Sequence, residues 1–279
     1  MKTTFATLLL CSLVFADARA TGFAVDPSGN LFFLGANPGR IFKFSPDGTV
    51  TKFATEEADE DWSDIAIDVS GNLFVSMTGH SERGDIVVSI LKFTPAGQRS
   101  TFIRNAGSGQ PTGLAIDRAS NLFVGIAPIT KSSKKAAIFK FDPKKVKARF
   151  AQGLEQPAHF AFDPQGNLFV FDQLHGVLKF APNGNQTLFA TGFSPYGLTC
   201  DAAGNLFAAD FEGDAILKFD RDGTKTVFAT KLKPWFLAFN KKDELFVLGD
   251  VDETGASGIL KFAPDATRTL FAKNPIDQK

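Results

Sequence analysis

The chain repeats one residue pattern six times, and this repeat limits the possible folds more than any other feature. A full copy has an apolar segment ending in Asp, a turn, Asn-Leu-Phe, Lys-Phe, a second turn and Phe-Ala, and some copies differ from it at single positions. The Asn of the Asn-Leu-Phe core lies at Asn30, Asn72, Asn121, Asn167 and Asn205, and a degenerate sixth copy has Glu244 at this place. The intervals are 42, 49, 46, 38 and 39 residues. A period of about 40 residues with several strands per unit predicts a solenoid or a propeller.

Each unit is expected to form four short strands. In the first copy they cover residues 23–26, 31–33, 41–44 and 50–54, where Phe and β-branched residues favour extended structure. The connectors carry turn residues, as in Asp26-Pro27-Ser28-Gly29-Asn30 and Ser45-Pro46-Asp47-Gly48. The period of a helix is not sustained anywhere beyond the N-terminus.

Six such units predict an all-β fold, a six-bladed β-propeller with four antiparallel strands per blade. A β-helix is also periodic, but its repeats are shorter and lack four strands each. The 31 Phe residues then fill the contacts between neighbouring blades. We expect a single propeller domain over 21–279, with repeats at about 22–54, 64–102, 113–151, 159–190, 197–229 and 236–272.

The first 20 residues predict a secretory signal peptide, with Lys2 followed by an apolar run. Ala18-Arg19-Ala20 offers cleavage after Ala20, and Val14-Phe15-Ala16 offers an earlier site. The protein is therefore expected to be secreted or periplasmic, and no later apolar stretch is long enough for a membrane span. The formal net charge is +0, which gives no general attraction to nucleic acid. Asn185-Gln186-Thr187 is a glycosylation sequon, which matters only in a eukaryotic host.

Function should come from the places where the repeats differ. The segments leading into each first strand and the loops between second and third strands should share one face, which also carries the longest insertions. Both Trp, the single Tyr and all three His residues fall there. We therefore expect a ligand site around the mouth of the central channel, formed by Trp62, Thr112, His159, Tyr196 and Trp235. A small molecule, glycan or peptide would bind there, and a protein partner is also consistent. The alternative is that Trp and Tyr only cap the blades.

Acidic residues on the same face suggest a Ca²⁺ site, because Ca²⁺ takes six to eight oxygen ligands. The metal candidates are Asp172, Asp210 and Asp250, which end the second strand in three consecutive repeats. The alternative is ordinary solvated charge. The Asp residues that open the Gly-Asn turns are instead expected to cap their own backbone. These are Asp26, Asp68, Asp117, Asp163 and Asp201.

Two histidines are candidates for catalysis. His159 and His175 lie in one repeat, and a His near an acid such as Asp172 can act as a general base. The alternative is that both are surface hydrogen-bonding residues. The chain has no zinc motif of the His-Glu-x-x-His kind and no nucleophile elbow.

The third repeat carries a family resemblance. Gly113-Leu114-Ala115-Ile116-Asp117, Asn121-Leu122-Phe123-Val124 and Ile138-Phe139-Lys140-Phe141 resemble the NHL-repeat pattern. The wider group is similar to the six-bladed propellers of the gluconolactonase/senescence-marker family, strictosidine synthase and virginiamycin B lyase. The gluconolactonase resemblance implies a lactonase whose divalent cation is held by a Glu of the first blade with an Asn and an Asp. Here the first repeat opens with Thr21-Gly22-Phe23, without that Glu.

Three functions follow, because one scaffold hosts many sites. The first is an exported binding module that uses the loop face around the channel. The second is a metal-dependent, Ca-type lactonase-like hydrolase. The third is a lyase like virginiamycin B lyase, with His159 as the residue that echoes its histidine signature.

Overall fold

The computed structural model describes residues 20–35, 39–58, 60–80, 84–129, 135–250 and 256–273. Within these ranges the chain is all β and contains no helix. No helix long and apolar enough to cross a membrane is therefore found in this part of the chain. The predicted signal peptide lies outside the described residues, except that Ala20 begins the first strand.

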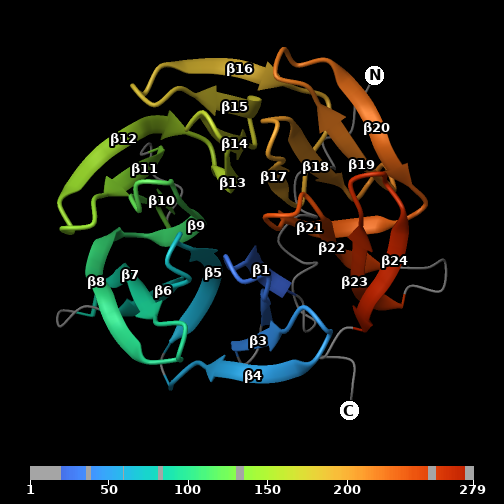
Figure 1. Ribbon diagram of the computed structural model, residues 1–279. Helices are drawn as coiled ribbons and strands as arrows, with labels where there is room; N and C mark the ends of the chain where they lie inside the picture. The colour runs from blue at the N-terminus through green and yellow to red at the C-terminus, as the bar shows by residue number, and fades with distance from the viewer. Residues whose placement is uncertain are drawn as a thin grey trace, which may run out of the picture.

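Six sheets of four antiparallel strands surround a central axis, as the sequence predicts (Figure 1). The innermost strands are β1 (Ala20–Val25), β5 (Asp61–Ile67), β9 (Gln110–Ile116), β13 (Ala158–Phe162), β17 (Leu198–Cys200) and β21 (Lys233–Phe239). The second strands are β2 (Leu31–Gly35), β6 (Leu73–His80), β10 (Leu122–Ala127), β14 (Leu168–Asp172), β18 (Leu206–Asp210) and β22 (Leu245–Asp250). The third strands are β3 (Arg40–Phe44), β7 (Ile86–Phe93), β11 (Ala136–Phe141), β15 (Gly176–Phe180), β19 (Ala215–Phe219) and β23 (Ser257–Phe262). The outermost strands are β4 (Val50–Thr55), β8 (Arg99–Ser108), β12 (Lys147–Leu154), β16 (Gln186–Ala190), β20 (Lys225–Thr230) and β24 (Arg268–Lys273).

The Asp of each repeat holds the turn between the first and second strands. Asp68 accepts hydrogen bonds from the backbone N–H of Ser70 at 2.9 Å and of Asn72 at 2.9 Å. It also accepts a third from the Asn72 side chain at 2.8 Å. The same pairing of Asp with Asn recurs in blades one, three, four and five. These Asp residues are therefore structural, as expected.

The degenerate sixth copy keeps this network with the roles of the two side chains exchanged. Asn240 now accepts from the backbone N–H groups of Lys242 and Glu244 through Oδ1. Its amide nitrogen donates to the Glu244 carboxylate at 2.7 Å. The Asp–Asn pair has thus become an Asn–Glu pair with the same geometry, which explains how the sequence can diverge here without loss of the turn.

Phenylalanines connect the strands within and between blades. The Phe of each Leu-Phe motif meets the Phe of the fourth strand edge to face, with ring centroids 4.9–5.1 Å apart in all six blades. Phe123 also contacts Phe162 of the next blade at 5.0 Å. Each of the six buried apolar clusters joins two neighbouring blades. The expected role of Phe between blades is therefore confirmed.

The ring closes by side-chain packing rather than by a shared sheet. Every sheet consists of four consecutive strands, so the described part of the chain exchanges no strand between the first and last blades. Strand β1 lies beside β21, and one apolar cluster joins Leu31 and Phe33 of blade one to Phe246 and Leu248 of blade six. Closure places the starts of all six inner strands around one point on the axis (Figure 1).

Candidate functional site

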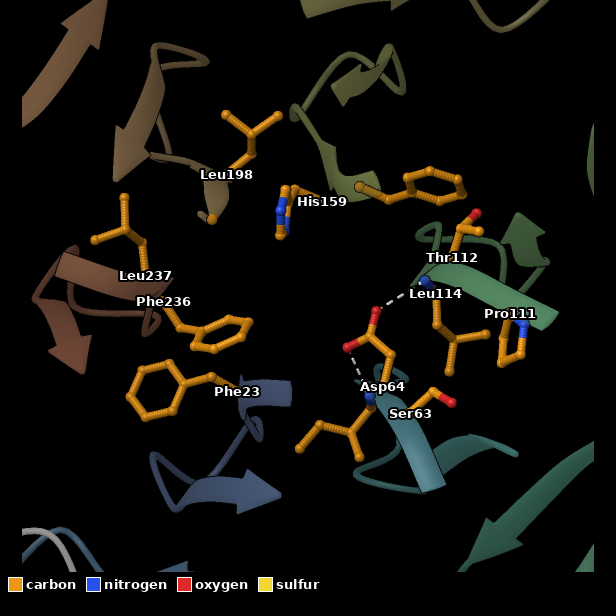
Figure 2. Close-up of a pocket in the computed structure, with 13 residues that line it drawn as sticks. Phe23, Ser63, Asp64, Pro111, Thr112, Leu114, His159, Leu198, Phe236 and Leu237 are labelled. Atoms are coloured by element: carbon orange, nitrogen blue, oxygen red, sulfur yellow. Dashed lines mark hydrogen bonds between the residues drawn. The ribbon is translucent and has the colours of Figure 1, made fainter. Parts of the chain in front are cut away.

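A cavity of about 240 Å³ lies among the inner strands at the centre of the ring (Figure 2). Its lining comes from all six blades and from nearly equivalent positions. The lining residues are Phe23, Ser63, Asp64, Ile65, Pro111, Thr112, Leu114, His159, Phe160, Gly197, Leu198, Phe236 and Leu237. All lie within an inner strand, except Gly197, which directly precedes β17.

One ring of this lining is apolar in every blade. It is formed by the residue three positions before the turn Asp, or before Asn240 in blade six. The six residues are Phe23, Ile65, Leu114, Phe160, Leu198 and Leu237. These side chains give the cavity an apolar surface contributed by every blade.

The residue four positions before the turn alternates between glycine and a larger side chain. Blades one to six carry Gly22, Asp64, Gly113, His159, Gly197 and Phe236. The three glycines lie so close to the next blade that a side chain would clash with it. A Cβ on Gly113 would lie 2.9 Å from the Phe160 ring, and one on Gly197 would lie 2.8 Å from the Trp235 carbonyl oxygen. The alternation leaves room for only three larger side chains, from blades two, four and six.

Asp64 is the single carboxylate in the lining. Ser63 is an extra residue in the pairing of β5 with β6, and this β-bulge turns the neighbouring side chain toward the axis. The two carboxyl oxygens accept hydrogen bonds from the backbone N–H of Ile65 at 2.8 Å and of Leu114 at 2.9 Å. The second bond joins blade two to blade three, and Figure 2 shows the carboxyl group directed toward the cavity.

Asp64 titrates far from its ordinary range. The Asp64 side chain faces the cavity and therefore keeps some accessible surface, although it lies deep inside the protein. Burial raises its pKa from 3.8 to about 7, and the two backbone hydrogen bonds only partly oppose this shift. Asp64 therefore changes between its neutral and ionised forms close to neutral pH.

His159 reaches the cavity through a strained backbone. Pairing of β13 with β14 is interrupted between Ala158 and Ala161, and His159 has a φ of 54°. A non-glycine residue in this region is uncommon and costly, so such strain is often found at binding sites. The imidazole stacks on Phe171, with centroids 6.5 Å apart. Burial lowers its pKa from 6.5 to about 4, which keeps the ring neutral at physiological pH.

Thr112 is the bulged residue of blade three, opposite the step from Gly125 to Ile126. Its hydroxyl oxygen is buried and has no hydrogen-bond partner among the described residues. This oxygen lies against Gly125, where an added Cβ would come within 2.5 Å of it. Thr112 thus lines the cavity while its hydroxyl is turned into the blade.

The structure brings together two of the five predicted ligand residues, Thr112 and His159. Trp62 is buried at 3% exposure between blades one and two, and its indole N–H donates to Glu60 at 3.1 Å. Tyr196 packs on Phe211, and Trp235 joins the cluster between blades six and one. None of these three aromatic residues lines the cavity, which favours their role as blade caps; their contact with a ligand stays a prediction.

The predicted metal ligands are not assembled into a cluster. Asp172 is fully buried and accepts the backbone N–H groups of Glu155 and His175, so its carboxylate holds a turn. Asp210 accepts the N–H of Gly213, and Asp250 ends β22 in the next blade. No group of three or more His, Cys, Asp or Glu side chains within the described ranges is placed to hold a metal ion. Asp172, Asp210 and Asp250 are thus not grouped as a metal site in the described residues, and their binding of Ca²⁺ stays a prediction.

The two histidine candidates, His159 and His175, do not share one site. The His175 ring is exposed and lies 2.6 Å from the Asp172 carboxylate through Nδ1, as the sequence suggests for a His–Asp pair. This pair is part of the loop between β14 and β15 and does not line the cavity. Only His159 of the two reaches the central site.

Asp64 is the residue that the repeat comparison missed. In the sequence it lies in the segment Asp61-Trp62-Ser63-Asp64, which leads into the second blade, and it is assigned no role there. Aligning the six repeats on the turn Asp shows it as the one carboxylate at a position otherwise held by Gly, His or Phe. Its depth in the channel depends on the bulge at Ser63, which the sequence does not reveal.

Comparison with protein-family models finds no match, and comparison with curated protein sequences finds none either. Solved structures share the six-bladed propeller fold with most of this chain. A gluconolactonase from Xanthomonas campestris superposes with a TM-score of 0.67 at 21% identity, covering 83% of each chain. Regucalcin from Agrobacterium tumefaciens, described as a calcium-binding protein, gives 0.65 at 16% identity, over 84% of this chain and 83% of its own.

A virginiamycin B lyase from Staphylococcus aureus gives a TM-score of 0.63 at 16% identity, over 93% of this chain and 85% of its own. These similarities agree with the resemblance found in the repeat residues and establish the fold. They leave the function to the site itself, because one fold carries many activities.

The cavity residues do not fit a Ca²⁺ ion of the kind that regucalcin's description implies. Ca²⁺ prefers six to eight oxygens, several of them ionised carboxylates. The lining offers one carboxylate, whose two oxygens already accept backbone N–H groups and whose pKa is raised. Neither a second acid nor an Asn or Gln side chain joins it in the lining.

Proposed function

We propose that the protein is a binding module that holds a small organic molecule in the central cavity. The observation that carries this proposal is the pair Asp64 and His159, which are polar groups held by strained or bulged backbone inside an otherwise largely apolar lining. Such a combination of an apolar surface with a few convergent polar groups is typical of ligand sites. The cavity volume of about 240 Å³ favours a small ligand over a glycan chain or a peptide.

The export predicted from the sequence is compatible with the same proposal. Residues 1–20 have the features of a secretory signal peptide, which would place the binding module in the periplasm or outside the cell. The ligand would then be a molecule that this compartment contains.

A thermal-shift screen of small molecules tests the proposal. A ligand at 100 times its Kd adds about 2.7 kcal/mol to the stability of the folded state, which shifts Tm by several degrees. The matched variants are Leu198→Trp, which fills the cavity, and Leu188→Trp on the exposed strand β16. Hits should stabilise the wild type and Leu188→Trp but not Leu198→Trp. Equal stabilisation of both variants, or the absence of any hit, would refute the proposal.

A lactonase-like hydrolase is the second candidate. The gluconolactonase and regucalcin folds are compatible with it, and Asp64 has the property that favours it, since a carboxyl group with a pKa of about 7 suits general acid–base chemistry. An assay of gluconolactone hydrolysis tests this candidate. The reaction is monitored through the protons it releases, with and without Ca²⁺. Turnover by the wild type and its loss in Asp64→Asn would support it, whereas turnover at the uncatalysed rate would exclude this substrate class. A lyase, the third function suggested by sequence, would have to use His159, the one histidine in the lining.

A further inference from the structure

The cavity lining contains few titratable groups. Among the lining residues only Asp64 and His159 titrate, and none is Lys or Arg. His159 is neutral at physiological pH because burial lowers its pKa to about 4. The lining therefore has a formal charge of either zero or −1, according to the state of Asp64, and it holds no positive group that would attract an anion.

Aromatic rings complete the same lining. Phe23, Phe160 and Phe236 reach it from blades one, four and six, and the imidazole of His159 adds a further ring. Figure 2 shows Phe23 and Phe236 on the side of the cavity opposite Thr112 and Leu114. The face of an aromatic ring attracts cations, and the attraction is strongest where water is excluded.

Asp64 keeps hydrogen-bonding capacity that the protein does not use. A carboxylate offers about four acceptor positions, and the backbone N–H groups of Ile65 and Leu114 take two of them. His159 in its neutral form has one acceptor nitrogen, and neither ring nitrogen is hydrogen-bonded to any residue that the structure describes. A primary ammonium group brings three donors and one positive charge, which matches these acceptors.

We propose that the ligand of the central cavity is an organic cation, whose ammonium group pairs with the Asp64 carboxylate while its apolar part packs on Phe23, Phe160 and Phe236. This assignment rests on the proposed binding function and names the chemical class of its ligand. It also gives the buried carboxylate a partner, which offsets part of the cost of burying its charge.

Binding of such a cation is linked to a proton. In the unliganded protein burial keeps Asp64 largely protonated below pH 7, and an ammonium group favours the ionised form. The cation must therefore displace the proton at low pH, and its apparent affinity falls tenfold for each pH unit below the pKa. We expect binding to be about 100-fold weaker at pH 5 than at pH 8. His159, with its pKa of about 4, does not titrate in this range.

Isothermal titration calorimetry with benzylammonium and short alkylammonium ions tests the proposal. The matched alcohols, such as benzyl alcohol, have nearly the same shape without the charge. Asp64→Asn removes the charge in the cavity, and Asp61→Asn makes the same change at an exposed position of the same strand. The ammonium ions should bind the wild type and Asp61→Asn, fail to bind Asp64→Asn, and weaken toward pH 5.

The outcomes separate this inference from the binding function itself. Equal affinity for alcohols and ammonium ions, or ammonium binding that is the same at pH 5 and pH 8, would overturn it; the pH comparison needs no variant and so holds even if Asp64→Asn folds poorly. The screen could also find only neutral or anionic ligands whose binding is lost in Leu198→Trp. The cavity would then bind ligands, but the cation assignment would be wrong. If nothing binds at all, both proposals fail.

Discussion

Replacing Asp64 should change how stability depends on pH, and the direction can be derived from the structure. The unfolded chain ionises this carboxyl group at its ordinary pKa of 3.8, whereas the folded protein holds the proton up to about pH 7. Between these values the unfolded state releases its proton first, so the contribution of Asp64 to the free energy of unfolding falls as pH rises. Above pH 7 both states are ionised, and the loss reaches its full value.

The magnitude follows from the width of this window. A difference between 3.8 and about 7, at 1.36 kcal/mol per pKa unit, gives an upper bound of about 4 kcal/mol. Because the Asp64 side chain keeps some accessible surface, solvent screening reduces this figure, and we expect about 2–4 kcal/mol between pH 4 and pH 7.

Urea unfolding of the wild type and of Asp64→Asn at a series of pH values measures the effect. The buried indole of Trp62 provides a fluorescence signal. The quantity to plot is the stability of the wild type minus that of the variant, because other titrating groups then cancel. This difference should fall from pH 4 to pH 7 and stay level above it, and Asp61→Asn should show no such trend. A difference that is flat, or that rises with pH, would refute the burial argument.

Three further predictions concern the same ring of inner strands. The stability of the wild type relative to His159→Gln should fall by up to about 3 kcal/mol as pH drops from 6.5 to 4. The cause is that the histidine binds a proton in the unfolded chain but stays neutral in the folded protein. NMR of the ring protons should show His159 still neutral at pH 5. Gly113→Ala should cost about 1–3 kcal/mol, since the new Cβ would lie 2.9 Å from the Phe160 ring, whereas Gly79→Ala, which meets only Met77 at 3.4 Å, should be nearly neutral in the same urea experiment. Asp68→Ala should cost about 1–3 kcal/mol through the loss of three hydrogen bonds at the turn, and unchanged stability would contradict the capping role.

The opposite signs for Asp64 and His159 have a consequence for experiment. Between pH 4 and pH 6.5 a falling pH favours the fold through Asp64 and opposes it through His159. The two effects offset each other in the wild type, so its pH profile alone does not reveal either group. Single variants are needed to separate them.

The repeat made the architecture predictable from sequence because it encodes local structure. Asp and Asn at the first turn, together with Gly at positive φ such as Gly29 and Gly71, set the reversals between strands. The paired Phe residues of the second and fourth strands supply the core in every blade. Six copies of one unit, none of which can bury its apolar faces alone, then require a closed ring.

The site was only partly predictable. Thr112 and His159, which the sequence singles out among the variable positions that lead into the inner strands, do line the central cavity. Trp62, Tyr196 and Trp235 stood out by residue type, yet packing turned them into the contacts between blades. Similarly, Asp172, Asp210 and Asp250 occupy matching positions in three repeats, but they end the second strands, which lie outside the innermost strands that meet at the axis.

The sequence by itself determined the six-bladed ring, its strand order and its turns, because these depend on contacts within a repeat or between adjacent repeats. Only the tertiary structure decided that Asp64 and His159 share a cavity. Their meeting depends on ring closure and on two β-bulges that reverse which way a side chain points. Their displaced pKa values likewise come from the surrounding protein, which forms only when residues from all six blades converge on the axis.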